Sequence, residues 1–379
     1  MLNKWLYVGG KENYFRFCNN GGKVWMLPAK KLRLSFNIYQ PSSFNGKVIK
    51  HLLPYISWAD LILNKFGIIK CKIEINAMVK KKIMQIFKTS DFELAVFEGT
   101  PGTHQKITIQ VMEKRKILGY CKITDSEEVK ALFKREEEIL FLLHSHGLNM
   151  VPRCLYCGNL IAENNDIQLF IQDTIKTNHA KVYHELKKEH IEFLKQLYEK
   201  TCTICSYKDS DLWAKIESIK MINEKLDKYI EKSTLESAIK SVEFFLEKQK
   251  KFSFYHADFT PWNMFFENGN IYVFDFEYAQ KRVIPFLDIF HFITQVNIFR
   301  NHQNADEIYQ QIFKGKYSNV INELFEDPKN SYLCYLLNSI ETYLMKNIEK
   351  ISDDDETCMV IWCDLISKII EVEGTYQKT

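Results

Sequence analysis

The sequence predicts an α+β protein with two lobes, and three observations lead to this prediction. Three apolar segments rich in β-formers follow one another closely from Phe92 onward. One amphipathic helix comes directly after them, over about 126–146. After about residue 178 the chain is mainly helical, except for a short β-hairpin pattern near residues 252–279. An antiparallel β-lobe that carries one helix, followed by a helical lobe with an inserted hairpin, satisfies this order.

The strands of the first lobe are predicted from alternating or continuous apolar runs. FELAVFEG, KITIQVM and ILGYCKIT should form three antiparallel strands, and two more are expected around 151–160 and 167–174, separated by the turn ENND. Upstream, KVWMLP and LRLSFNIYQ resemble strands, and NNGG and PSSFNG resemble turns. A helix is expected over 57–67, with Ser57 as its cap and Gly67 at its end.

Charge divides the chain unevenly and indicates three parts. Residues 1–90 hold 16 Lys/Arg and 3 Asp/Glu, a net +13, while the remainder holds 35 and 45, a net −10. We therefore expect a basic N-terminal extension over 1–90, a β-lobe over 91–175 and a helical lobe over 176–379. The extension either docks on the acidic remainder, which we favour, or contacts an anionic partner: a phosphorylated substrate, an acidic membrane surface or nucleic acid.

Composition favours a cytoplasmic protein without structural metal. No apolar run is long enough to cross a bilayer, and the first residues lack the pattern of a signal peptide. The ten cysteines are scattered, which is typical of reduced thiols. The pairs Cys154/Cys157 and Cys202/Cys205 could supply four thiolates to zinc, but buried thiols are the preferred interpretation. No motif combines aromatic and basic residues as nucleic-acid recognition requires, so no nucleic acid is expected as a partner.

The inserted hairpin contains the residues that could carry chemistry. It contains His256-Ala-Asp258-Phe-Thr-Pro-Trp-Asn263 and, twelve residues after Asn263, Asp275-Phe-Glu277. Phosphoryl transfer from ATP needs a group that orients the attacking hydroxyl and hard oxygen ligands for magnesium. Asp258 suits the first role, and Asn263 and Asp275 suit the second. The hairpin should place the two motifs side by side. An isolated HxDxxxxN arises often by chance, so the full order of motif, strand, turn and strand carries the prediction.

HADFTPWN followed by VFDFE resembles the catalytic loop and metal-binding segment of the aminoglycoside phosphotransferase and choline kinase superfamily, whose members have a protein-kinase-like fold. The resemblance covers about residues 92–295. It implies that Asp258 is the catalytic base, that His256 braces the loop, and that Asn263, Asp275 and Glu277 bind Mg²⁺. It also implies a supporting role for Asp288. Ala257 stands where glycine is usual; alanine fits there unless φ is positive, so we discount the difference.

The same resemblance implies a nucleotide site in the first lobe. Lys122, in a strand, would hold the ATP phosphates, and Glu136, in KREEEILFLL, would hold the lysine, although Glu137 and Glu138 are adjacent alternatives. The loop with Gly99 and Gly102 is placed where a phosphate-covering loop belongs. Adenine should meet the segment that contains Gln172, Asp173 and Thr174.

The resemblance implies an ATP- and Mg²⁺-dependent kinase for a hydroxyl group of a small molecule: a sugar, an amino sugar, a choline-like alcohol or an aminoglycoside. The alternative is a non-catalytic kinase-like module that recruits an anionic partner through residues 1–90. Retention of Lys122, Asp258, Asn263 and Asp275 argues for the enzyme. The acceptor, the preference for ATP over GTP and the oligomeric state are not determined by the sequence.

Overall fold

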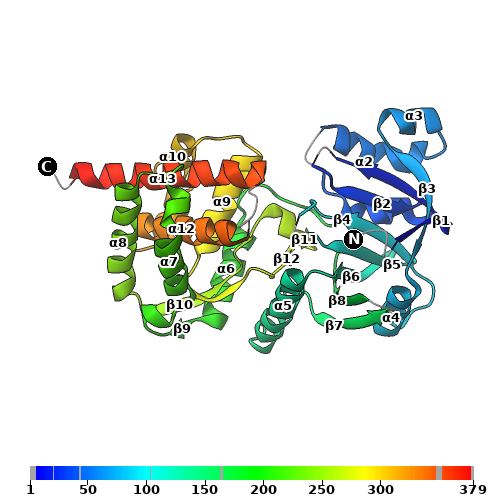
Figure 1. The fold of residues 1–379 in the computed structure, drawn as a ribbon, viewed down its shortest axis with the longest axis horizontal. Coiled ribbons are helices and arrows are strands. Elements are labelled where there is room, and N and C mark those ends of the chain that lie inside the picture. Colours follow the sequence, from blue (N-terminus) through cyan, green and yellow to red (C-terminus); the bar gives the residue numbers. More distant parts are fainter. Residues whose placement is uncertain are drawn as a thin grey trace. The chain divides into compact units, whose positions relative to one another are not determined.

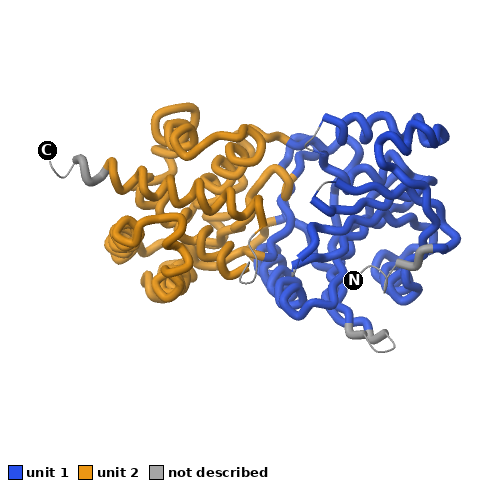
Figure 2. Tube along the Cα trace, turned by 45° about the horizontal axis from the view of Figure 1, so that its top comes forward, with its two compact units in different colours: residues 1–145, 149–182, 265–277 blue, residues 146–148, 183–264, 278–379 orange. Residues whose placement is uncertain are grey.

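The computed structural model describes residues 6–19, 21–41, 44–102, 104–162, 165–346 and 352–376. It divides the chain into two compact units, which Figure 2 colours blue and orange. Unit 1 comprises residues 1–145, 149–182 and 265–277, and unit 2 comprises residues 146–148, 183–264 and 278–379. None of the described helices is both long enough and apolar enough to cross a membrane.

Unit 1 is built on one eight-stranded antiparallel sheet, and its order is β3-β1-β2-β4-β5-β6-β8-β7 (Figure 1). The strands are β1 Leu6–Cys18, β2 Val24–Pro28, β3 Ile69–Ile75, β4 Glu93–Glu98, β5 Ile107–Glu113, β6 Lys116–Thr124, β7 Cys154–Ala162 and β8 Asn165–Asp173. The predicted strands from Phe92 to residue 174 are therefore confirmed. The ENND turn at 163–166 lies partly outside the described residues.

The two faces of this sheet bury different apolar sets because successive side chains of a strand point to opposite sides. One face packs Val79 and Ile83 of α4 (Ala77–Phe87) against Tyr14, Val96 and their neighbours. The other face packs Leu53 of α2 and Leu63 of α3 against residues such as Trp25. The helices on this face are α1 Leu32–Ser35, α2 Phe44–Ile56 and α3 Asp60–Lys65. Residues 6–75 thus supply three strands and one helical layer to the same unit as the predicted β-lobe.

Two predictions for the segment between residues 32 and 67 were wrong. The segment 32–40 forms α1 and a short 3₁₀ turn, not a strand. Its apolar residues Leu32, Leu34 and Phe36 pack against one face of the sheet instead of extending the sheet. The helix expected over 57–67 begins at Asp60, and its N-cap is Ala59, not Ser57. Gly67 ends it in the left-handed region as expected, with φ +67°.

One long helix and one hairpin complete unit 1 near its candidate site. Helix α5 (Glu127–Ser145) matches the predicted amphipathic helix and buries Val129, Phe133 and Leu140 among others. The predicted hairpin is also confirmed, as β11 (Met264–Glu267) paired with β12 (Asn270–Val273). Its turn uses Asn268 and Gly269, both with positive φ.

Unit 2 is mainly helical, as predicted. Its helices are α6 Lys188–Thr201, α7 Asp211–Ile222, α8 Lys232–Lys248, α9 Leu287–Phe299, α10 Ala305–Phe313, α11 Ser318–Leu324, α12 Pro328–Lys346 and α13 Asp353–Tyr376. A small sheet, β13-β10-β9, contains β9 Thr203–Ile204, β10 Lys251–Tyr255 and β13 Gln280–Val283. Helix α9 is buried along nearly its whole length. Its polar residues therefore need partners inside the unit.

Candidate active site

The loop after β10 in unit 2 is fixed by hydrogen bonds from its own backbone. The Asp288 carboxylate, near the start of α9, accepts the N–H of His256 at 2.9 Å and the N–H of Ala257 at 3.2 Å. The Asp258 N–H in turn donates to His256 Nδ1 at 3.2 Å. Burial raises the pKa of Asp288 to about 7, although the two N–H donors act in the opposite direction. Asp288 and His256, both buried, thus hold the loop in one shape.

The conformation at Ala257 corrects the sequence interpretation. Its φ is +67°, in the left-handed region that glycine adopts without cost. A side chain there costs about 1–2 kcal/mol. Alanine in place of the glycine that the resembling motif usually has is therefore strained and not neutral.

Asp258 presents its carboxylate at the end of this braced loop. The carboxylate accepts a hydrogen bond from Asn263 Nδ2 at 2.7 Å, and the same amide reaches the Asp258 carbonyl at 3.0 Å. The Asp258 side chain is 39% exposed, so a ligand can reach it. Asn263 follows Thr260 in a short 3₁₀ turn that begins with Pro261, whose fixed φ suits that position.

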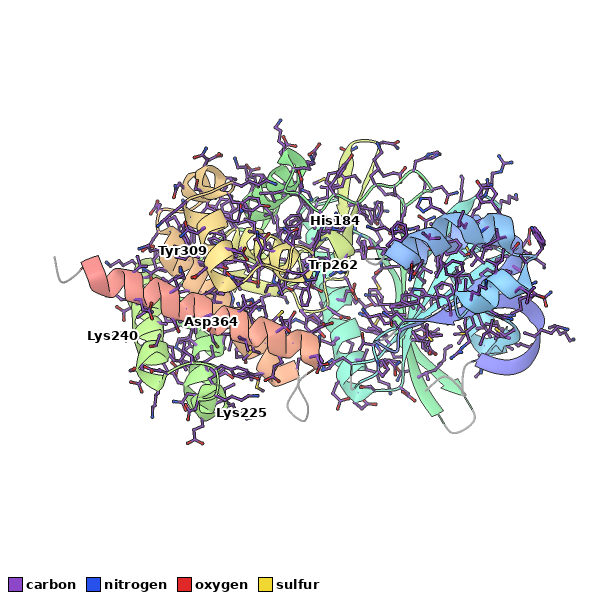
Figure 3. All side chains as sticks on the ribbon, turned by 90° about the horizontal axis from the view of Figure 1, so that it is seen from above. His184, Lys225, Lys240, Trp262, Tyr309 and Asp364 are labelled. Carbon is purple, nitrogen blue, oxygen red and sulfur yellow. The ribbon has the colours of Figure 1, made fainter. Side chains whose placement is uncertain are left out.

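His291 is a residue of this loop's surroundings that the sequence analysis missed. Its Nε2 lies 3.4 Å from Asp258 Oδ1, and its side chain is buried. On α9 it follows Asp288 by three residues, so both project from one side of the helix. That spacing was visible in FLDIFHF. The Trp262 ring centroid lies 6.5 Å from that of His184, and Trp262 is partly exposed. Figure 3 labels both residues.

A second polar cluster lies in unit 1, where β6, α5 and the end of the hairpin meet. Lys122 Nζ lies 2.6 Å from Glu136 Oε2 and 2.6 Å from Asp275 Oδ1. The Glu136 side chain is completely buried, and burial raises its pKa to about 7 even though Lys122 opposes this. Burial also acts to raise the pKa of Asp275, but Lys106 and Lys122 outweigh it and hold that pKa well below its usual range. The structure pairs Lys122 with Glu136, whereas Glu138 is exposed on the helix.

Lys106 is the second residue that the sequence analysis missed. It stands at the end of the glycine-containing loop, directly before β5, and its Nζ lies 3.2 Å from Asp275 and 2.5 Å from Glu277. Burial acts to lower the pKa of Lys106, but Asp275 and Glu277 together outweigh burial and raise this pKa well above its usual value. The amine therefore stays charged. A single lysine between Gln105 and Ile107 matches no motif, so nothing in the sequence indicated it.

The carboxylates of this cluster fit a divalent cation. Oxygens of Glu136, Asp275 and Glu277 lie within 4.8 Å of one another. Within the described part of the chain, Glu136 Oε1 is buried and accepts no hydrogen bond. Hard carboxylate oxygens are the ligands that Mg²⁺ prefers. No comparable group of cysteines occurs among the described residues, and burial raises the pKa of Cys154 and Cys157 to about 12 each.

The remaining predicted residues lie at the ends of strands in unit 1. Gly99 follows β4, and its carbonyl accepts the Gln105 side chain at 3.1 Å. Gly102 has φ +157°, in the same loop. Gln172 is buried near the end of β8. The Asp173 side chain accepts a hydrogen bond from the backbone N–H of Arg153 at 2.7 Å, and the Thr174 side chain accepts one from the backbone N–H of Lys176 at 3.2 Å. Both side chains therefore already have hydrogen-bond partners in unit 1.

Neither family models nor curated proteins match this chain, whereas solved structures do. A thermostable mutant of aminoglycoside phosphotransferase APH(4)-Ia, in a ternary complex with ADP and hygromycin B, is 12% identical with a TM-score of 0.51. The alignment covers 77% of this chain and 98% of that one. An ethanolamine kinase from Plasmodium vivax is 16% identical over 91% of this chain and 95% of its own, with a TM-score of 0.48.

The first of these structures establishes the fold. The chain shares the fold of this aminoglycoside phosphotransferase, which confirms the predicted two-lobed, protein-kinase-like α+β fold class and, at the level of fold, the resemblance inferred from HADFTPWN and VFDFE. At this level of identity the likeness concerns the fold and does not identify a reaction.

Proposed function

We propose that the protein is an ATP-dependent kinase that moves the γ-phosphoryl group to a hydroxyl of a small molecule: a sugar, an amino sugar, a choline-like alcohol or an aminoglycoside. One observation carries this proposal. Asp258 keeps a partly exposed carboxylate while Asn263 and the braced backbone fix its position. A general base must be both accessible and oriented, whereas a buried structural aspartate such as Asp288 is oriented but not accessible.

Each of the predicted residues is proposed to have one task. Asp258 accepts the proton of the attacking hydroxyl, and His291 holds the carboxylate from the other oxygen. Lys122, oriented by Glu136, binds the phosphate chain as a fixed cation. Asn263, Asp275 and Glu277 would hold magnesium through oxygen atoms, and the ion supplies charge neutralisation for the transferred group. Gly99, Gly102 and the backbone of 172–174 are proposed to contact the nucleotide.

The test compares the wild type with Asp258→Ala in magnesium-dependent ADP release, screened against the four acceptor classes. We expect acceptor-stimulated turnover that disappears in Asp258→Ala and persists in Asp227→Ala, a control at an exposed aspartate of the same unit. Full activity of Asp258→Ala would refute the assigned base.

The alternative, a non-catalytic module, is favoured by one observation. The Lys106 ammonium already lies against Asp275 and Glu277, the carboxylates assigned to the metal. If the Lys106 ammonium and a metal ion compete for these carboxylates, Lys106→Met should increase the affinity for Mn²⁺. Electron paramagnetic resonance without nucleotide measures this affinity. If wild type and Lys106→Met both fail to bind Mn²⁺, with or without ATP, the metal assignment is wrong and the module is the better interpretation.

A further inference from the structure

Exposed apolar side chains gather on one part of unit 1, far from the polar clusters in sequence. Of nineteen large hydrophobic side chains that are exposed in the described part of the chain, seven fall within residues 44–69. Scattered exposed hydrophobics are normal on a protein surface, but such a concentration marks an interaction site. The seven are Phe44, Leu52, Tyr55, Trp58, Leu61, Ile62 and Ile69. We call this surface the α2–α3 face; Figure 1 shows both helices at the same edge of the sheet.

The first helix of the face is apolar on two sides. Leu53, with Ile49 and Ile56, packs into the core beneath the sheet. Phe44, Leu52 and Tyr55 follow an i, i+8, i+11 spacing, which places them within about 80° of arc on a helix of 3.6 residues per turn. Phe44 is 79% exposed and Tyr55 64% exposed. This stripe is therefore not part of the core.

The turn after α2 and helix α3 carry further exposed apolar side chains. Trp58 is 79% exposed, and its indole Nε1 donates to the Tyr55 carbonyl at 3.2 Å, which holds the ring beside the end of α2. Leu61 is 83% exposed, while Leu63, two residues on, is buried. A pocket of about 570 Å³ opens beside Trp58, and its lining includes Lys70 and Lys72.

Basic side chains border these apolar residues. The Arg33 guanidinium lies 4.8 Å above the Tyr55 ring, and exposed Lys47, Lys65 and Lys72 stand on the same segments. Residues 1–90 carry 16 basic and 3 acidic side chains. This charge argues against pairing of two copies through the same face, because two basic faces would repel. It favours an anionic surface.

We propose that the α2–α3 face docks on an anionic lipid bilayer, with Phe44, Trp58 and Leu61 inserted at the interface and the bordering lysines against lipid phosphates. Aromatic and leucine side chains beside a basic border are the features of helices that lie in the plane of a membrane. Tryptophan and tyrosine suit the boundary because one part of each ring system is apolar and one is polar. The pocket beside Trp58 offers room for a headgroup and is lined by Lys72 and by Lys70, whose Nζ also lies 2.6 Å from Asp60 of α3.

The test is flotation of the full chain with vesicles of phosphatidylcholine containing 30% phosphatidylglycerol, compared with phosphatidylcholine alone. Binding should require the anionic lipid and weaken as salt rises. Trp58→Ser/Leu61→Ser should lower the partition coefficient at least about tenfold. Lys47→Glu/Lys65→Glu should lower it by more than about tenfold, since each basic residue near the surface contributes about fivefold. Quenching of tryptophan fluorescence by brominated lipids should be lost in Trp58→Phe.

A matched control separates the face from general surface hydrophobicity. Met221→Ser/Phe244→Ser removes two exposed hydrophobics of unit 2, which are 83% and 62% exposed, and should leave vesicle binding unchanged. Asp258→Ala should also bind like the wild type, so the proposal stands or falls separately from the kinase assignment. Equal binding by Trp58→Ser/Leu61→Ser would overturn it. So would failure of the wild type to float, or a concentration-dependent dimer that this variant abolishes.

Discussion

The pair Lys122–Glu136 allows a quantitative prediction about the centre of unit 1. Lys122→Met removes the ammonium that lies 2.6 Å from both Glu136 and Asp275, and it leaves the Glu136 carboxylate fully buried. Glu136→Gln removes the charge from the other side. The combined variant removes both charges, so the three variants form a double-mutant cycle that isolates the pair.

The magnitude follows from burial and from the pKa of Glu136. Breaking a buried ion pair by removing one partner costs about 3–5 kcal/mol, because the remaining charge has no counter-ion. Loss of the Lys122 contact over the Phe170 ring, 5.2 Å from its centroid, adds to this. Burial already raises the pKa of Glu136 to about 7, so protonation relieves part of the cost near neutral pH. We therefore expect Lys122→Met to lower the free energy of unfolding of unit 1 by about 3 kcal/mol.

The measurement is hydrogen exchange of the β6 and α5 amides, which reports on the unit that contains both residues even if the other unit unfolds separately. We expect a coupling energy of at least about 1.5 kcal/mol between Lys122→Met and Glu136→Gln. The combined variant should be more stable than Lys122→Met alone, and still inactive. A coupling energy below about 0.5 kcal/mol would show that the two side chains do not share one buried network, and would refute the reasoning.

Three further predictions follow from the loop and the β8 segment. Ala257→Gly should stabilise unit 2 by about 0.5–1 kcal/mol in urea denaturation because it relieves the left-handed strain, whereas Ala238→Gly, inside α8, should destabilise it. Asp288→Asn replaces one acceptor oxygen by an NH₂ group, which cannot accept from the backbone N–H groups of residues 256 and 257. We therefore expect kcat to fall while KM for nucleotide stays unchanged. An unchanged kcat would show that Asp288 does not position the loop. Burial lowers the pKa of Lys176 from 10.5 to about 7, so between these values the unfolded chain holds a proton that the folded one lacks, and stability rises with pH. Lys176→Met should therefore stabilise unit 1 by about 2–4 kcal/mol at pH 7, and by little at pH 10.5; an equal gain at both pH values would contradict the assigned cause.

The sequence by itself determined the order of elements from Phe92 onward and the motifs that carry the proposed chemistry. Strand periodicity, the amphipathic helix and the hairpin turn are local properties, and each has a short-range physical cause. The residues Asp258, Asn263 and Asp275 were selected because HADFTPWN and VFDFE resemble a known catalytic loop and metal-binding segment, and because phosphoryl transfer needs a base and oxygen ligands for a metal ion. Their roles stay a prediction. The pairing partner proposed for Lys122 followed from the same resemblance.

Only the tertiary structure decided the features that depend on distant segments or on backbone dihedral angles. Segment 32–40 alternates like a strand, but in the fold it is helical and buries Leu32, Leu34 and Phe36 against one face of the sheet. The strain at Ala257 depends on a φ that no residue type reveals. Lys106 reaches Asp275 and Glu277 across about 170 residues of sequence, and no periodicity encodes such a contact. Trp58 and Leu61 could as well have been core residues: whether an apolar side chain of an amphipathic segment is buried depends on which face the rest of the fold covers.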